Sequence, residues 1–194
     1  TVDDADEKIS TNTTDEDVSV THRRTGIRLM VEVKNACRGD FSDGKRSKVM
    51  KGIPHFKVKC HKSRSNIEKI TSTNDRYILG EFDLLVANPR NAIYEGATFT
   101  RNLQFIDSSL IQILKDYYGV TTNRELEEKC NNDWRFAFPE DIAEDYNGIM
   151  AIPRTPYVAL SGDEKWFGID SLAQRLEEKA IEKVKELRNS RKHK

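Results

Sequence analysis

The chain has 194 residues, of which 37% are hydrophobic and 33% charged, and its 32 basic residues balance 32 acidic ones. This length and composition predict one polar domain that can bury a core without disulfides. They exclude a membrane-spanning helix, because no apolar run approaches the ~20 residues that a bilayer requires. Cys37, Cys60 and Cys130 are too few and too scattered for a disulfide framework or a four-thiol zinc site. We therefore expect a cytoplasmic protein with reduced thiols.

The charges are unevenly distributed along the chain. The first seventeen residues carry seven acids and one base, whereas residues 45–67 carry eight Lys or Arg and no acid. The tail from Arg188 to Lys194 is also basic. A neutral protein with such a concentrated basic segment presents a local patch for an anionic partner, without a general affinity for polyanions.

The first half of the chain predicts an arm followed by short strands. Residues 1–16 have the composition of an acidic flexible arm, with at most a short helix over 3–9. Residues 17–194 are predicted to form one domain. Val18–His22 alternates apolar and polar side chains, as a half-buried strand does, and residues 23–26 form a turn in which Gly26 can adopt positive φ. A second and more apolar strand is predicted over residues 27–33.

Further strands are expected after a loop over residues 38–52. The alternation in residues 53–60 places Lys57 and Lys59 on the face opposite Phe56 and Val58. Residues 62–75 are polar and are predicted to be flexible. Residues 77–88 contain a run that is apolar enough for a central strand, and the Asn-Pro pair at 88–89 ends it.

The second half predicts helices and edge strands. Apolar residues at helical spacing predict a helix over 108–118, which Gly119 caps. A strand is expected over 134–138, and residues 149–160, with two prolines, are expected to be extended. The clearest helix runs from about 169 to 191, with Asp170 or Ser171 as N-cap. Its narrow apolar stripe is expected to pack on the body or on a second copy of the chain. These elements favour an α/β (α+β) fold with a central mixed sheet.

The candidate active site consists of Asp17, Glu32 and Lys34. Residues i and i+2 of a strand share a face, so Glu32 and Lys34 should lie side by side. Asp17 lies nine residues before Gly26 and Glu32 six after it, so a folded-back hairpin should bring the two acids together. Two carboxylates form a hard oxygen site that suits Mg²⁺, and a metal beside a lysine suits phosphodiester hydrolysis. Glu81 and Asp83 form a rival i, i+2 pair, but Leu85 stands where a lysine would be needed. We favour a role for Asp83 in hydrogen-bonding the backbone at a strand end or in supporting the site.

This segment resembles the PD-(D/E)xK nuclease superfamily, which includes many type II restriction endonucleases. The family pattern is an acid at the start of a strand, a hairpin, and then acid-x-Lys, which Asp17, Glu32 and Lys34 match. The basic strand at residues 55–60 and the apolar strand at 80–87 are also similar. The chain departs from the pattern at Glu16, where the family has Pro, and it lacks a clear helix before the first strand, where Glu7 is only a guess for a further acid. The resemblance covers about residues 14–90.

The resemblance implies a restriction-endonuclease-like fold with a central mixed β-sheet flanked by helices. It also implies a Mg²⁺-dependent DNA endonuclease, for which Mn²⁺ could substitute. Asp17 and Glu32 would hold the metal, and Lys34 would assist the attacking water. Cutting both strands of double-stranded DNA needs two such sites, so a homodimer is expected, and no membrane association.

The basic segment supplies the residues that we expect to contact DNA. Cations can neutralise phosphates, and neutral donors can bind phosphates or base edges. The predicted DNA-binding residues are Lys45, Arg46, Lys48, Lys57, Lys59, Lys62, Ser63, Arg64 and Asn66. Two alternatives stay open: a non-catalytic DNA-binding or specificity module that uses this segment, and a protein-interaction domain in which the acidic arm and the basic patch mask each other.

Overall fold

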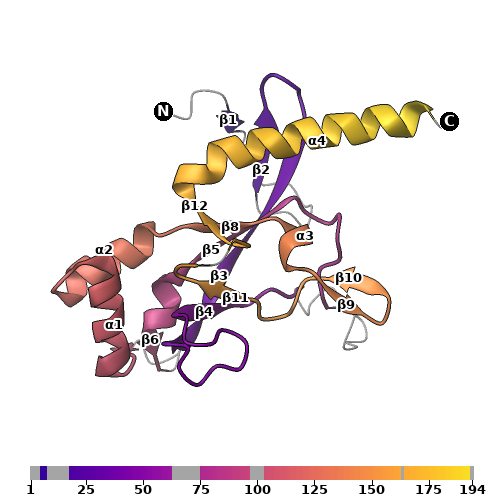
Figure 1. The fold of residues 1–194 in the computed structure, drawn as a ribbon. Coiled ribbons are helices and arrows are strands. Elements are labelled where there is room, and N and C mark those ends of the chain that lie inside the picture. Colours follow the sequence, from indigo (N-terminus) through magenta and orange to yellow (C-terminus); the bar gives the residue numbers. More distant parts are fainter. Residues whose placement is uncertain (1–4, 8–17, 63–74, 97–102, 163, 193–194) are drawn as a thin grey trace.

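A computed structural model describes residues 5–7, 18–62, 75–96, 103–162 and 164–192. Within these ranges the chain forms a curled mixed β-sheet and four α-helices (Figure 1). The predicted α+β class with a mixed sheet is therefore confirmed at this level. No helix in the described ranges has the length and apolar character needed to traverse a bilayer.

The main sheet has the strand order β1-β2-β3-β5-β8-β12, and β4 and β11 extend it from β3. Neighbouring strands are antiparallel except for β3 and β5, which are parallel. The strands of this sheet are β1 (Ala5–Glu7), β2 (Val18–His22), β3 (Arg28–Ser42), β4 (His55–Val58), β5 (Leu84–Asn88), β8 (Arg135–Ala137), β11 (Tyr157–Ala159) and β12 (Phe167–Gly168). Two small hairpins complete the strands: β6 (Tyr94–Glu95) with β7 (Gln104–Phe105), and β9 (Glu144–Tyr146) with β10 (Ile149–Ala151).

The helices and helical turns lie mostly in the second half of the chain. They are η2 (Pro89–Ile93), α1 (Ser108–Tyr118), α2 (Asn123–Asn132), α3 (Pro139–Ile142), η3 (Ile169–Ser171) and α4 (Leu172–Lys192). The predicted helix over 108–118 is confirmed, and Gly119 ends it in the left-handed conformation at φ 65°. The long C-terminal helix is also confirmed, but the expected N-cap is wrong. Residues Ile169–Ser171 form a 3₁₀ turn that leads directly into α4.

The longest strand, β3, carries both residues of the predicted acid-x-lysine triplet, Glu32 and Lys34. Its first half lies between β2 and β5, and its second half pairs with β4. The loop predicted from residue 38 is wrong up to Ser42, because β3 continues to that residue. The pairing of β3 with β4 shifts register between Ala36 and Phe41, and Gly39 supplies the positive φ (68°) within the shift. A polar, glycine-containing stretch is thereby held as a strand by tertiary pairing.

The N-terminal region differs from the arm or short helix expected over 3–9. Ala5–Glu7 form strand β1, which pairs antiparallel with β2 through Asp6 opposite Thr21. Residues 1–4 and 8–17, which include Asp17, lie outside the described residues.

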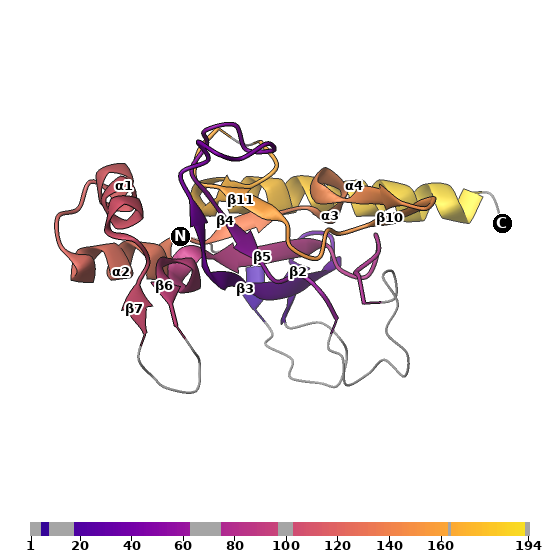
Figure 2. The same cartoon turned by 90° about the horizontal axis from the view of Figure 1, so that it is seen from below.

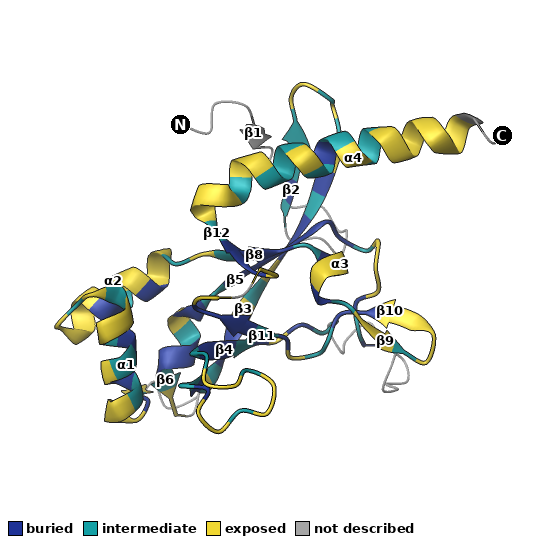
Figure 3. Cartoon of the chain, viewed as in Figure 1, coloured by how far each residue is buried: buried dark blue, intermediate teal, exposed yellow. Residues whose placement is uncertain are grey.

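The two faces of the sheet are buried in different ways. On one face α4 covers Val31, Leu84 and Val86, and its partly buried Leu172 and Leu176 pack there. The other face belongs to the larger core, which includes Leu85 and Ala87 of β5 together with residues of β4, β11, α1 and α2. Figure 3 shows the contrast between the buried strands and the exposed C-terminal half of α4. Glu32 lies on β3 between these layers.

Candidate active site

The alternation of β3 brings Glu32 and Lys34 to one face of the sheet, next to the larger core. Val31 packs under α4. Glu32 lies opposite Leu85 of β5, which belongs to the larger core. The Glu32 residue is 2% exposed, and the side chain of Lys34 is 18% exposed. The acid is thus inside the protein, and the lysine reaches toward its surface. A charge at this depth requires a partner.

The two charges of β3 form a cluster with Tyr77. The Lys34 ammonium is ion-paired with Glu32 Oε1. The Tyr77 hydroxyl donates to the same oxygen at 2.7 Å, and Lys34 Nζ donates to the Tyr77 hydroxyl oxygen at 3.1 Å. Each of the three side chains therefore contacts the other two. We call Glu32, Lys34 and Tyr77 the inner cluster.

The electrostatics of the inner cluster fix its protonation. Burial alone would lower the pKa of the Lys34 amine, but its hydrogen bonds to Glu32 and Tyr77 outweigh burial and raise that pKa. Burial and the hydrogen bond to Glu32 together raise the pKa of the Tyr77 hydroxyl. Lys34 is therefore a cation at neutral pH and Tyr77 a neutral donor. In this arrangement Lys34 can orient a water molecule or offset phosphate charge, but it cannot accept a proton.

The hairpin that should bring Asp17 to Glu32 is present as predicted. Residues 23–26 form the turn, with Gly26 at φ 68° and its N–H donating to the His22 carbonyl at 2.8 Å. The pairing of β2 with β3 ends with Val18 opposite Val31, one residue before Glu32. Asp17 itself lies outside the described residues. Its distance to Glu32 stays a prediction.

The rival acids Glu81 and Asp83 have other partners. The Asp83 carboxylate accepts from the Met30 N–H at 2.8 Å through Oδ2, and its Oδ1 is ion-paired with Lys183 of α4. Glu81 is paired with Lys62 and accepts from the Ile78 N–H at 2.9 Å. The predicted backbone hydrogen bond of Asp83 is thus confirmed, and its carboxylate joins α4 to β3.

Glu32 is the carboxylate that the described residues offer to a metal in the inner cluster. Among the described residues, no group of three or more His, Cys, Asp or Glu is placed to hold a metal ion. A protein Mg²⁺ site commonly uses one or two carboxylates together with waters and substrate phosphate, so Glu32 supplies at least one of them. The residues fit Mg²⁺ through Glu32 if Asp17 supplies the second carboxylate.

The predicted DNA-binding residues divide into three groups. Lys45, Lys57 and Lys62 form ion pairs with Asp43, Asp40 and Glu81. Arg46, Lys48 and Lys59 are exposed. Ser63, Arg64 and Asn66 lie outside the described residues. The first group is partly neutralised, which weakens its contribution to a basic patch.

One member of the basic segment lies beside the inner cluster. Lys62 Nζ is 5.8 Å from the centroid of the Tyr77 ring, and Lys34 Nζ is 5.1 Å from the same centroid. Cations at this range are attracted to the face of an aromatic ring. The structure therefore places two lysines about one tyrosine.

Tyr77 is the residue that sequence reasoning missed. It precedes β5 and reaches Glu32 from 45 positions along the chain. Its ring is fixed edge-on against Phe82 at 5.3 Å between centroids. The sequence offered no signal that a tyrosine seven residues before β5 would contact the acid-x-lysine triplet.

The comparisons with known proteins add no relative. No protein-family model matches the chain, and neither the curated proteins nor the solved structures contain a match.

Proposed function

We propose that the protein is a Mg²⁺-dependent DNA endonuclease of the restriction-endonuclease-like type. The observation that carries the proposal is the inner cluster. An acid and a lysine two residues apart on a strand are held together in a buried position, on the strand of a hairpin whose other strand begins just after Asp17. Buried titratable groups with strongly shifted pKa values are enriched at functional sites.

The proposed roles follow from the chemistry of each residue. Asp17 and Glu32 would hold Mg²⁺, with Mn²⁺ as a substitute. The bound ion would polarise a phosphoryl oxygen and lower the pKa of a bound water. Lys34, kept cationic by its neighbours, would offset charge on the attacked phosphate and position the water. Tyr77 would keep the Glu32 carboxylate oriented through its 2.7 Å hydrogen bond.

Double-stranded DNA is the proposed substrate, and a homodimer is the proposed assembly, because two strands require two such sites. The mixed sheet, the hairpin and the acid-x-lysine triplet on its second strand support the restriction-endonuclease-like fold as part of this proposal. Lys62 lies beside Tyr77 and places a second cation near Lys34, although its ion pair with Glu81 partly neutralises it.

A second candidate function is a DNA-binding or specificity module without catalysis. The observation that favours it is the mutual pairing within the inner cluster. Glu32 already accepts from Tyr77 and is already paired with Lys34. Such a cluster could serve only to join β3 to the segment before β5.

Cleavage of supercoiled plasmid separates the two functions. The wild-type protein should nick or linearise the plasmid with Mg²⁺ and leave it intact with EDTA. Glu32→Gln should reduce the rate by about 100-fold or more while preserving DNA binding, because the amide keeps the shape but loses the charge. Glu127→Gln is a matched control, since Glu127 also accepts from a tyrosine, Tyr94, and lies on α2, outside the inner cluster.

Two results would contradict the nuclease. One is a plasmid that stays intact with Mg²⁺ or Mn²⁺ in the presence of wild-type protein that binds DNA. The other is cleavage by Glu32→Gln at the rate of the wild type and of Glu127→Gln. Either result would leave the non-catalytic module.

A further inference from the structure

The C-terminal end of α4 projects beyond the rest of the molecule. Figures 1 and 2 show from two directions that the helix crosses the sheet and then continues past it. Ala180 is fully buried, but all seven residues from Lys185 to Arg191 are exposed (Figure 3). We call residues 185–191 the outer segment.

The outer segment carries positive charge without ion-pair partners. Lys185, Arg188 and Arg191 form no ion pair within the part of the chain that the structure describes. Closer to the sheet, by contrast, Lys179 is paired with Glu140 and Lys183 with Asp83. Within the described chain the ion pairs of α4 therefore end at Lys183, and the last two turns of the helix carry three unpaired cations and one acid, Glu186.

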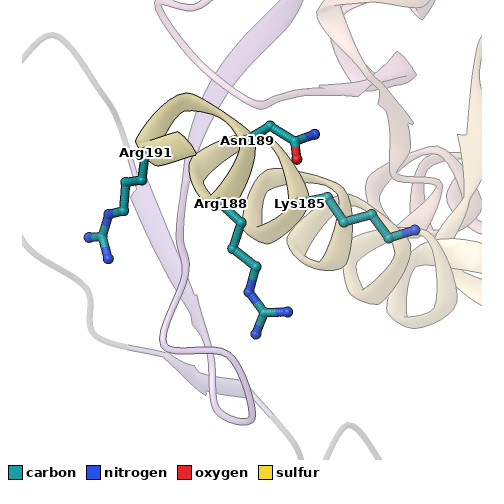
Figure 4. A pocket seen from close by; sticks show the side chains of 4 residues that line it. All are labelled: Lys185, Arg188, Asn189 and Arg191. Atoms are coloured by element: carbon teal, nitrogen blue, oxygen red, sulfur yellow. The ribbon is translucent and has the colours of Figure 1, made fainter. Parts of the chain in front are cut away.

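The exposed cations surround an open hollow at the end of the helix. Its lining residues are Lys185, Arg188, Asn189 and Arg191, and its volume is about 500 Å³. Figure 4 shows the three basic side chains extended away from the helix. Asn189 adds an amide that can donate to an anionic oxygen. An anionic surface can approach all four residues.

An ion pair and a hydrogen bond connect the start of the outer segment to the strand of the proposed site. Lys183, two residues before the outer segment, is paired with Asp83, and Asp83 accepts from the N–H of Met30. Met30 lies two residues before Glu32 on β3. The outer segment therefore begins close to the start of β3, the strand that carries Glu32.

We propose that the outer segment binds the phosphate backbone of double-stranded DNA. The inference rests on the proposed function, since it takes the same DNA as its ligand, and it assigns a surface outside the basic segment at 45–67. Successive cations spaced by three residues rise about 4.5 Å along a helix. Duplex DNA offers one negative charge per ~1.7 Å of its axis, so a helix end can meet several phosphates.

A second copy of this chain is a poorer occupant for the outer segment. A twofold dimer brings the same surface of both copies together. Leu187, which is 53% exposed, would supply apolar contact in such a dimer. The dimer would, however, bring the three unpaired cations of one copy toward the same three of the other. The phosphates of DNA would instead attract these cations.

The test measures DNA binding without cleavage, using the full chain in EDTA. Fluorescence anisotropy with an unrelated duplex of about 20 base pairs is recorded between about 50 and 200 mM NaCl. The variant carries Lys185→Gln, Arg188→Gln and Arg191→Gln. The control carries Arg90→Gln, Arg124→Gln and Lys129→Gln, which remove equal charge from η2 and α2, at the other end of the molecule (Figure 1).

We expect the α4 variant to bind about tenfold or more weakly, and the slope of log affinity against log salt to be shallower by about 2 to 3. The loss should be the same for several duplex sequences, because backbone contacts do not read bases. The control should stay close to the wild type. Equal affinity and slope for the α4 variant and the control would overturn the proposal.

Further outcomes distinguish this proposal from the nuclease itself. If the α4 variant loses DNA binding but the wild type never cleaves, DNA binding by the outer segment is supported and the nuclease activity is contradicted. If cleavage depends on Glu32 but the α4 variant binds DNA like the wild type, the nuclease activity is supported and DNA binding by the outer segment is contradicted. A shift from dimer to monomer in sedimentation, without weaker DNA binding, would assign the outer segment to a second copy and overturn the proposal.

Discussion

The inner cluster and the outer segment use charge in opposite ways. In the inner cluster, Glu32 and Lys34 are shielded from water, and Tyr77 contacts both. In the outer segment, three cations are exposed and have no ion-pair partner in the described chain. Buried charges depend on individual partners and are weakly screened, whereas exposed charges act through their number and are screened by salt. We therefore expect the inner cluster to govern stability and chemistry, and the outer segment to govern DNA affinity alone.

The largest expected effect is the loss of one buried partner. Glu32→Leu leaves the Lys34 ammonium without its counter-ion in a largely buried position. We expect the free energy of unfolding to fall by about 3 kcal/mol, measured by urea denaturation at neutral pH. An unchanged midpoint would show that the cluster is not a coupled unit.

Replacing both charges should be milder than removing one. In the double variant Glu32→Leu/Lys34→Leu, no buried charge is left unpaired. We expect it to recover about half or more of the stability lost in Glu32→Leu, because well-packed apolar residues can replace a buried ion pair. Cleavage should stay absent in the double variant. Recovery of plasmid cleavage together with stability would break the link between the cluster and catalysis.

A smaller effect is expected from the tyrosine, with a defined pH dependence. Tyr77→Phe removes a hydrogen bond to Glu32 and should cost about 1 kcal/mol at neutral pH. Because the folded pKa of Tyr77 is raised above its ordinary value of 10.0, the unfolded chain loses this proton first. Wild-type stability should therefore fall as pH rises above about 10, and this fall should be shallower in Tyr77→Phe. Urea denaturation between about pH 8 and 11 checks this. Identical slopes would contradict the assignment.

The smallest effect on stability is expected in the outer segment. The triple variant Lys185→Gln/Arg188→Gln/Arg191→Gln removes exposed side chains that have no ion-pair partner in the described chain. Its free energy of unfolding should stay within about 0.5 kcal/mol of the wild type, although its DNA affinity falls. A large loss of stability would show that these cations support the fold, and would remove the contrast with the inner cluster.

The sequence predicted the features that depend on local pattern. The alternation in Val18–His22 predicted β2, and the i, i+2 spacing of Glu32 and Lys34 predicted their contact. The pairing of residues 38–42 with β4 could not be predicted, because it depends on a partner strand and on a register shift near Gly39. Their composition alone is that of a loop.

Two omissions have different causes. Helix α2 carries a capping box between Thr122 and Glu125, which could have revealed it, but its apolar stripe is reduced to Leu126 and Cys130. Tyr77 gave no comparable signal, because its role depends on contact across the fold. The exposure of Lys185–Arg191 likewise follows from where the sheet ends, which no pattern within the helix encodes.

The position of Asp83 has a consequence for engineering the protein. One carboxylate fastens both α4, through Lys183, and β3, through the Met30 N–H. A chain shortened after Val184 retains the ion pair between Lys183 and Asp83 and loses the outer segment. The length of the helix beyond Lys183 can thus be changed without touching Asp83, whereas a substitution of Lys183 removes one partner of the carboxylate that also binds β3.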